Sequence, residues 1–272
     1  ERQIKSNVTI FDGTLYKAMH RPSRIEMVNI NMKKLILPPE LLLGNFAENG
    51  LYSVIVDAGR DYQISYLDLE GNYLTNITFL SSLVNLEVLH LKRNYILTIP
   101  GSAVAPLTKL KYLYLQHNGF KTIPWTDLPR TLIHLDCNKG HMESADFTNV
   151  SLPSLEYLGL QENFITTINI TTLLQVAPRL KEAQLQNEKM TEHELDQIYD
   201  ALRSKNISFI NAPWPKSYCK QNDDYQYEDG ECVRRRPEMV GTGMAILLSG
   251  VVIGVAAGFI YIVVLAFRHM NR

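Results

Sequence analysis

The strongest constraint on the fold is one apolar pattern that recurs every 22 to 25 residues. The pattern reads L-x-x-L-x-L-x-x-N-x-L, and the six copies start at Ile64, Leu86, Leu110, Leu132, Leu155 and Leu180. Two copies are degenerate, with Gly140 and Glu188 at the Asn position. Because one such unit cannot bury its apolar face alone, successive units must stack and share an elongated core.

The pattern also predicts what each unit contributes. The central L-x-L forms a short strand whose alternate side chains turn inward, and Cys137 takes one of these slots as a small buried thiol. The Asn side chain bonds backbone groups where the chain leaves the strand. The predicted fold is an α/β solenoid with a parallel concave sheet.

The flanks predict where the solenoid begins and ends. Residues 1–24 are a predicted N-terminal cap and residues 25–210 the repeat domain, with Ile25-x-x-Val28-x-Ile30 as an irregular first repeat. A further candidate, Leu51-x-x-Val54-x-Val56, breaks the period. Downstream, Thr191 to Glu194 form a predicted capping box before an amphipathic helix, and a final strand is expected at Ile207 and Phe209.

The C-terminal region predicts one membrane span. No charged residue occurs between Glu238 and Arg268, and 24 helical residues from Met244 to Phe267 would rise about 36 Å, which exceeds a hydrocarbon core of about 30 Å. We assign residues 239–267 to a transmembrane helix and 268–272 to a short cytoplasmic tail. Gly250, Gly254 and Gly258 lie on one helical face, where a homo- or heterodimer partner helix can approach closely.

The orientation of the span has two interpretations. The Arg234–Arg236 run would keep the large domain in the cytosol, as in a tail-anchored intracellular scaffold. The start at Glu1 instead suggests a removed signal peptide, and five N-x-[ST] sequons exceed the ordinary chance yield. We therefore expect a plasma-membrane type I glycoprotein with an extracellular N-terminus, glycosylated at Asn7, Asn76, Asn149, Asn169 and Asn206.

Residues 211–238 form a predicted acidic juxtamembrane stalk. Cys219 and Cys232 would form a disulfide in an oxidising compartment, or one of them would link to a partner chain. Tyr225 and Tyr227 lie among five acidic residues, which makes them candidate sulfation sites, although a solvated spacer explains the same composition.

The outward strand positions predict the candidate binding face. Tyrosine and histidine are enriched there, and tyrosine supplies contact area at low entropic cost. Strand surfaces also favour tyrosine for cross-strand packing alone. The candidate ligand-binding residues are Tyr66, His90, Tyr112, Tyr114, His134 and Tyr157.

Other function classes find little support in the sequence. A net charge of −1 argues against nucleic-acid binding, and no nucleotide-binding or hydrolase motif occurs. His90, His134 and Asp136 lie on different repeats without a local metal-binding frame, so we expect no metal, cofactor or catalytic residue.

The six units identify a leucine-rich-repeat domain over about residues 25–210, and the arrangement resembles the leucine-rich-repeat immune proteins of mosquitoes that carry one transmembrane span. The repeat block, the segment from Leu185 to Asn206 and the two stalk cysteines carry this resemblance. The chain departs from it by lacking a cysteine-rich N-terminal cap and a coiled-coil tract. The resemblance implies non-catalytic cell-surface recognition of a protein ligand or co-receptor, in innate immunity.

Overall fold

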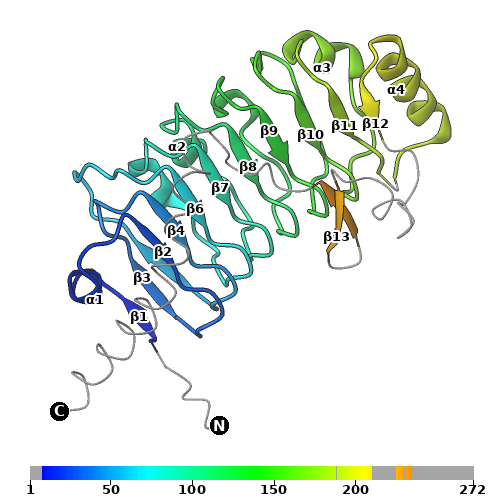
Figure 1. The fold of residues 1–272 in the computed structure, drawn as a ribbon. Coiled ribbons are helices and arrows are strands. Elements are labelled where there is room, and N and C mark those ends of the chain that lie inside the picture. The colour runs from blue at the N-terminus through cyan, green and yellow to red at the C-terminus, as the bar shows by residue number, and fades with distance from the viewer. Residues whose placement is uncertain (1–7, 188, 210–224, 229–230, 235–272) are drawn as a thin grey trace. The chain divides into compact units, whose positions relative to one another are not determined.

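The computed structural model describes residues 8–187, 189–209, 225–228 and 231–234, and the chain divides into two compact units, Glu1–Asn211 and Ala212–Arg272. In the first unit, nine short parallel strands lie side by side in one sheet, called the main sheet below (Figure 1). They are β2 (Arg24–Glu26), β4 (Leu43–Asn45), β6 (Tyr66–Asp68), β7 (Val88–His90), β8 (Tyr112–Tyr114), β9 (His134–Asp136), β10 (Tyr157–Gly159), β11 (Glu182–Gln184) and β12 (Ser208–Phe209). The predicted solenoid with a parallel sheet is confirmed.

The repeat leucines form the core. The middle residue of each strand from β6 to β10 is a leucine with at most 1 % of its surface exposed. Cys137 is fully buried as predicted, and burial raises the pKa of its thiol well above the usual value. The core runs without interruption from Phe11 to Ile207.

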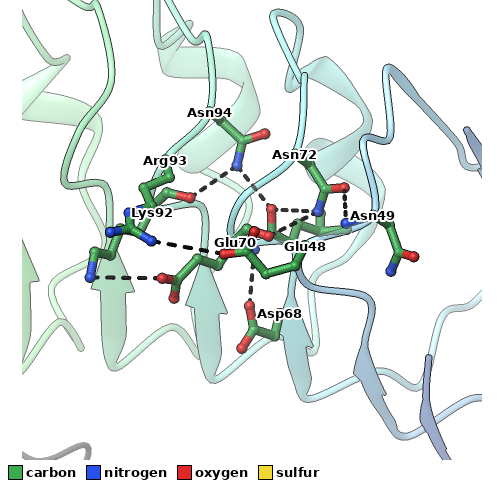
Figure 2. Close-up of polar contacts among 9 residues, drawn as sticks. Glu48, Asn49, Asp68, Glu70, Asn72, Lys92, Arg93 and Asn94 are labelled. Carbon is green, nitrogen blue, oxygen red and sulfur yellow. Dashed lines mark hydrogen bonds and ion pairs between the residues drawn. The ribbon is translucent and has the colours of Figure 1, made fainter. Parts of the chain in front are cut away.

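The repeat asparagines form a buried column, called the asparagine ladder, of Asn49, Asn72, Asn94, Asn118, Asn163 and Asn187. Asn118 shows the common pattern: its Nδ2 donates to the carbonyl oxygens of Leu91 in the preceding coil and Leu115 in its own, both at 2.9 Å. Its Oδ1 accepts the Ile96 N–H of the preceding coil at 3.1 Å. Figure 2 shows Asn49, Asn72 and Asn94 in the same arrangement. The ladder thus joins adjacent coils where they leave the main sheet.

The two degenerate repeats differ in the residue that they place at the ladder position. Gly140 contributes no side chain, and a Cβ at this glycine would lie 2.7 Å from Asn163 Oδ1. In the last repeat the ladder residue is Asn187, not Glu188 as the spacing predicted, and Glu188 lies outside the described residues. Asn187 Oδ1 accepts the Asn163 N–H at 2.7 Å, so the coil reaches the ladder one residue early.

The N-terminal part corrects two predictions. A second parallel sheet comprises β1 (Ile10–Phe11), β3 (Lys34–Ile36) and β5 (Ser53–Ile55), so the strand near Val54 is not in the main sheet. The coil that contains Val54 contributes β4 to the main sheet, and Gly44 and Phe46 replace the repeat leucines there. A Cβ at Gly44 would lie 2.8 Å from the Phe46 ring, so the large ring fills the space that the glycine leaves.

The segment predicted as an N-terminal cap, residues 1–24, packs against the first coils of the solenoid. Its strand β1 pairs with β3, and Phe11 and Tyr16 join the core, Tyr16 from helix α1 (Gly13–Ala18). Strand β2 shows that the first repeat is centred on Ile25, which pairs with Gly44, and not on Val28.

Short helical turns connect the later coils. They are η1 (Thr78–Ser82), α2 (Gly101–Val104), η2 (Trp125–Asp127) and α3 (Ile170–Val176). The predicted capping box is confirmed at α4 (Glu192–Ser204): Thr191 Oγ1 accepts the Glu194 N–H, and a Glu194 carboxylate oxygen accepts the Thr191 N–H. The predicted final strand is β12, which pairs with β11.

The second unit contributes an antiparallel pair, β13 (Tyr225–Glu228) and β14 (Glu231–Arg234), in which Tyr227 is opposite Cys232. Cys219, the predicted transmembrane helix at 239–267 with Gly250, Gly254 and Gly258, and the tail lie outside the described residues. Among the residues that the structure does describe, none belongs to a helix long and apolar enough to cross a membrane.

Candidate binding surface

Five of the six predicted binding residues form one continuous row of rings across the main sheet, called the ring row. The His90 and Tyr114 rings stack at 4.3 Å between centroids, and the His134 and Tyr157 rings at 4.1 Å. Tyr114 contacts His134 at 4.7 Å, which joins the two stacks, and Tyr66 extends the row beside His90 at 5.6 Å. Tyr112 lies beside the row, 6.3 Å from His134.

Stacking removes half of these candidates from solvent. His90, Tyr114 and Tyr157 are only 3 %, 8 % and 5 % exposed, because each flat ring is covered by its neighbours. For these three residues cross-strand packing accounts for the observed positions. Tyr66, Tyr112 and His134 are half-buried and still present surface to solvent.

A carboxylate lies near each end of the ring row. The Tyr66 hydroxyl donates to Asp68 Oδ2 and the Tyr157 hydroxyl to Asp136 Oδ2, each at 3.3 Å. Burial raises the pKa of Asp136 to about 6, although hydrogen bonds from Asn138, Gln116 and Tyr157 oppose the shift. Asp136 therefore changes its charge near pH 6, at the Tyr157 end of the ring row.

The Asp136 carboxyl makes the stability of the solenoid pH-dependent. Its pKa is about 6 when folded and near 3.8 when unfolded, so the folded chain binds the proton more tightly and this group adds stability as the pH falls from about 6 to about 4. Asp136→Asn removes this contribution. We expect the stability of Asp136→Asn relative to the unsubstituted protein to fall by about 1 kcal/mol between pH 8 and pH 5 in urea titrations. An equal difference at both pH values would contradict the prediction.

A charged cluster lies beside the row at the ends of β6 and β7 (Figure 2). Lys92 Nζ lies 3.7 Å from Glu70 Oε1 with both side chains buried, and Arg93 lies 4.0 Å from Glu48 at the more exposed side. Asp68, Glu70 and His90 offer ligand atoms within 4.8 Å of one another, a set that suits a divalent cation. The Lys92 ammonium already pairs with the Glu70 carboxylate, so a metal would compete with it.

This cluster was not predicted from the sequence, where His90 was considered together with His134 and Asp136. Strand alternation would have predicted the cluster, because it places Asp68 and Glu70 on one face of the sheet, and the strand register places His90 opposite Asp68. His117 lies in the next coil. Burial, and after it the positive charges of Lys139, Lys92 and Arg93, lower the pKa of His117 to about 4, so its imidazole is neutral at pH 7.

Known proteins share this architecture. Residues 62–120 match the family described as leucine rich repeat. These residues are therefore leucine-rich repeats, and the solenoid around them has the leucine-rich-repeat fold. Chaoptin of Tribolium castaneum is 26 % identical over 157 residues, which are 56 % of this chain but only 17 % of chaoptin. The chain therefore spans less than a fifth of the length of that relative.

Two solved structures show the same fold. The LRIM1/APL1C complex aligns over 88 % of this chain and 43 % of its own, with 20 % identity and a TM-score of 0.56. The Toll–Spatzle complex of Drosophila aligns over 59 % of this chain and 25 % of its own, with 23 % identity and a TM-score of 0.51. Identities this low support the leucine-rich-repeat fold alone.

Four of the five predicted glycosylation sites lie in the part of the leucine-rich-repeat domain that is described, and all four are exposed: Asn76, Asn149, Asn169 and Asn206. Asn169 Oδ1 caps α3 by accepting the Thr172 N–H, and Asn76 Oδ1 accepts the Thr78 N–H. Both bonds use the oxygen and leave the amide nitrogen, the atom that carries a glycan, available. Asn7 lies outside the described residues, and glycosylation stays a prediction.

Proposed function

We propose that this protein is a non-catalytic recognition protein that binds a protein ligand or co-receptor on its main sheet. The observation that carries the proposal is the half-buried set Tyr66, Tyr112 and His134, whose rings contact neighbouring rings of the main sheet. Aromatic side chains already fixed before binding lose little entropy in a complex, which favours affinity.

We further propose a setting at the outer face of the plasma membrane, in innate immunity. The sequons and the apolar segment at 239–267 support the membrane setting. The immune role is supported by the resemblance to mosquito leucine-rich-repeat proteins and by the likeness of fold to the LRIM1/APL1C and Toll–Spatzle complexes. Sulfation of Tyr225 and Tyr227 would add negative charge for a basic partner.

The binding proposal is tested by proximity labelling on intact cells that express the full chain. We expect Tyr66→Ala with Tyr112→Ala to reduce capture of the labelled partners at least several-fold, since two aromatic contacts are lost. Val84→Ala, an exposed apolar residue away from the main sheet, serves as the matched control. Unchanged capture by the tyrosine double variant, at equal surface level, would remove the main sheet from the proposal.

The second candidate is a tail-anchored scaffold with a cytosolic repeat domain, which the Arg234–Arg236 run favours. Removal of N-linked glycans distinguishes the two. A mobility shift of the cell-made protein after glycosidase treatment means that the domain was translocated, whereas an unshifted band supports the cytosolic scaffold.

A further inference from the structure

The edge of the solenoid that follows the asparagine ladder exposes a contiguous apolar surface, called the edge ridge. Its residues Tyr52, Tyr73, Tyr95, Leu97 and Phe164 are each between 40 % and 64 % exposed. Single exposed apolar residues are ordinary, but contiguous ones mark interaction sites. The Tyr73 and Tyr95 rings contact at 5.7 Å, and Leu97 lies over Gly119 next to His141, which contacts Phe164.

The edge ridge has an approximate internal symmetry. The residues that directly follow the ladder position in four successive coils are Gly50, Tyr73, Tyr95 and Gly119, an order that reads the same in both directions. Two residues further along each coil lies a second column, which reads Lys33, Tyr52, Thr75, Leu97, Lys121 and Glu143. Lys33 and Tyr52 lie in the two coils before the Tyr73 coil, and Lys121 and Glu143 lie in the two coils after the Tyr95 coil. Backbone hydrogen bonds from Tyr52 to Lys33 and from Glu143 to Lys121 confirm that these are neighbours in the column.

We propose that the edge ridge binds a second copy of this chain in an antiparallel arrangement, with a twofold axis between the coils of Tyr73 and Tyr95. A twofold interface requires one surface that is complementary to its own reversed image. Reversal about this axis places Tyr73 opposite Tyr95 of the other copy, Tyr52 opposite Lys121, and Lys33 opposite Glu143. Each contact occurs twice.

The chemistry of the three pairings matches. Opposed tyrosine rings at the centre remove apolar area from water, and Lys121 facing Tyr52 is a cation–π pair. Lys33 already lies over the Tyr73 ring at 5.9 Å, so its ammonium points along the edge ridge. Glu143 is held at 2.8 Å by Lys121, which fixes its carboxylate at the position that Lys33 of the second copy would reach. Exposed ion pairs add little affinity, and here they determine the register and direction of the dimer.

Cysteine cross-linking of the full chain tests the arrangement. Within one chain Lys33 and Glu143 lie five coils apart, about 24 Å at 4.8 Å per coil, so a short bismaleimide cannot join them intramolecularly. In chains that also carry Cys219→Ser and Cys232→Ser, we expect a cross-linked dimer when copies with Lys33→Cys are mixed with copies with Glu143→Cys, and only background when either variant is treated alone. A dimer in a single-variant sample, or none above background in the mixture, would overturn the proposal.

Charge reversal tests the same contact without cysteines and separates it from association through the membrane segment. Lys33→Glu and Glu143→Lys each create two like-charge contacts, and we expect roughly ten-fold weaker self-association for each variant. The double variant Lys33→Glu/Glu143→Lys reverses both partners and should restore association. Two weakened single variants with an equally weak double variant would refute this register. Lys33 and Glu143 do not belong to the main sheet. The result of this dimer test is therefore independent of whether Tyr66 and Tyr112 bind a ligand.

Discussion

Asn118→Ala is expected to lower the free energy of unfolding of the solenoid by roughly 3–5 kcal/mol. The side chain is buried, and its amide donates to the carbonyl oxygens of Leu91, Leu115 and Gln116 while it accepts the Ile96 N–H. Alanine leaves these backbone groups inside the protein without a partner, and each unpaired group costs about 1–3 kcal/mol. Urea denaturation followed by circular dichroism measures the loss.

A matched control separates the ladder from the general cost of replacing asparagine. Asn45 is half-buried and accepts one backbone hydrogen bond, from Ala47 at 3.1 Å. Asn45→Ala should cost only about 1 kcal/mol. If the two variants lose the same stability, the ladder does not join the coils as its hydrogen bonds indicate.

The main architecture follows from the sequence because burial determines the repeat positions. Leu89 and Leu113 have no exposed alternative once the coils stack, and Asn94 and Asn118 each satisfy backbone groups in two coils. The pattern fails where a different residue fills the same space. Phe46 compensates for Gly44, and for that reason the repeat at β4 has no recognisable leucine signature.

The exposure of the candidate site did not follow from the pattern. Strand alternation correctly places Tyr114 and Tyr157 on the outward face, but it contains no information about how far a neighbouring ring covers them. Stacking by His90 and His134 depends on side-chain torsions and on the size of residues in adjacent coils. The one-residue shift that brings Asn187 into the ladder likewise depends on how the last coil meets Asn163.

Lys92→Met is the second substitution with a large expected effect, about 3–5 kcal/mol lower stability. Lys92 and Glu70 are both 7 % exposed, and their charged atoms lie 3.7 Å apart. The carboxylates of Glu70 and Asp68 lie within 4.8 Å of each other. Methionine preserves most of the aliphatic packing but removes the ammonium, so the buried carboxylates lose a compensating charge. Urea denaturation at pH 7 gives the magnitude.

Two further variants show that burial, and not the distance between the charges, determines this cost. Lys181 and Glu156 lie closer together, at 2.8 Å, yet their side chains are 70 % and 38 % exposed, so Lys181→Met should cost at most about 1 kcal/mol. Adding Glu70→Gln to Lys92→Met removes one buried charge and should recover part of the lost stability, while Asp68 retains the remainder. If Lys181→Met cost as much as Lys92→Met, or the double variant were less stable than Lys92→Met alone, the uncompensated carboxylate would not be the cause.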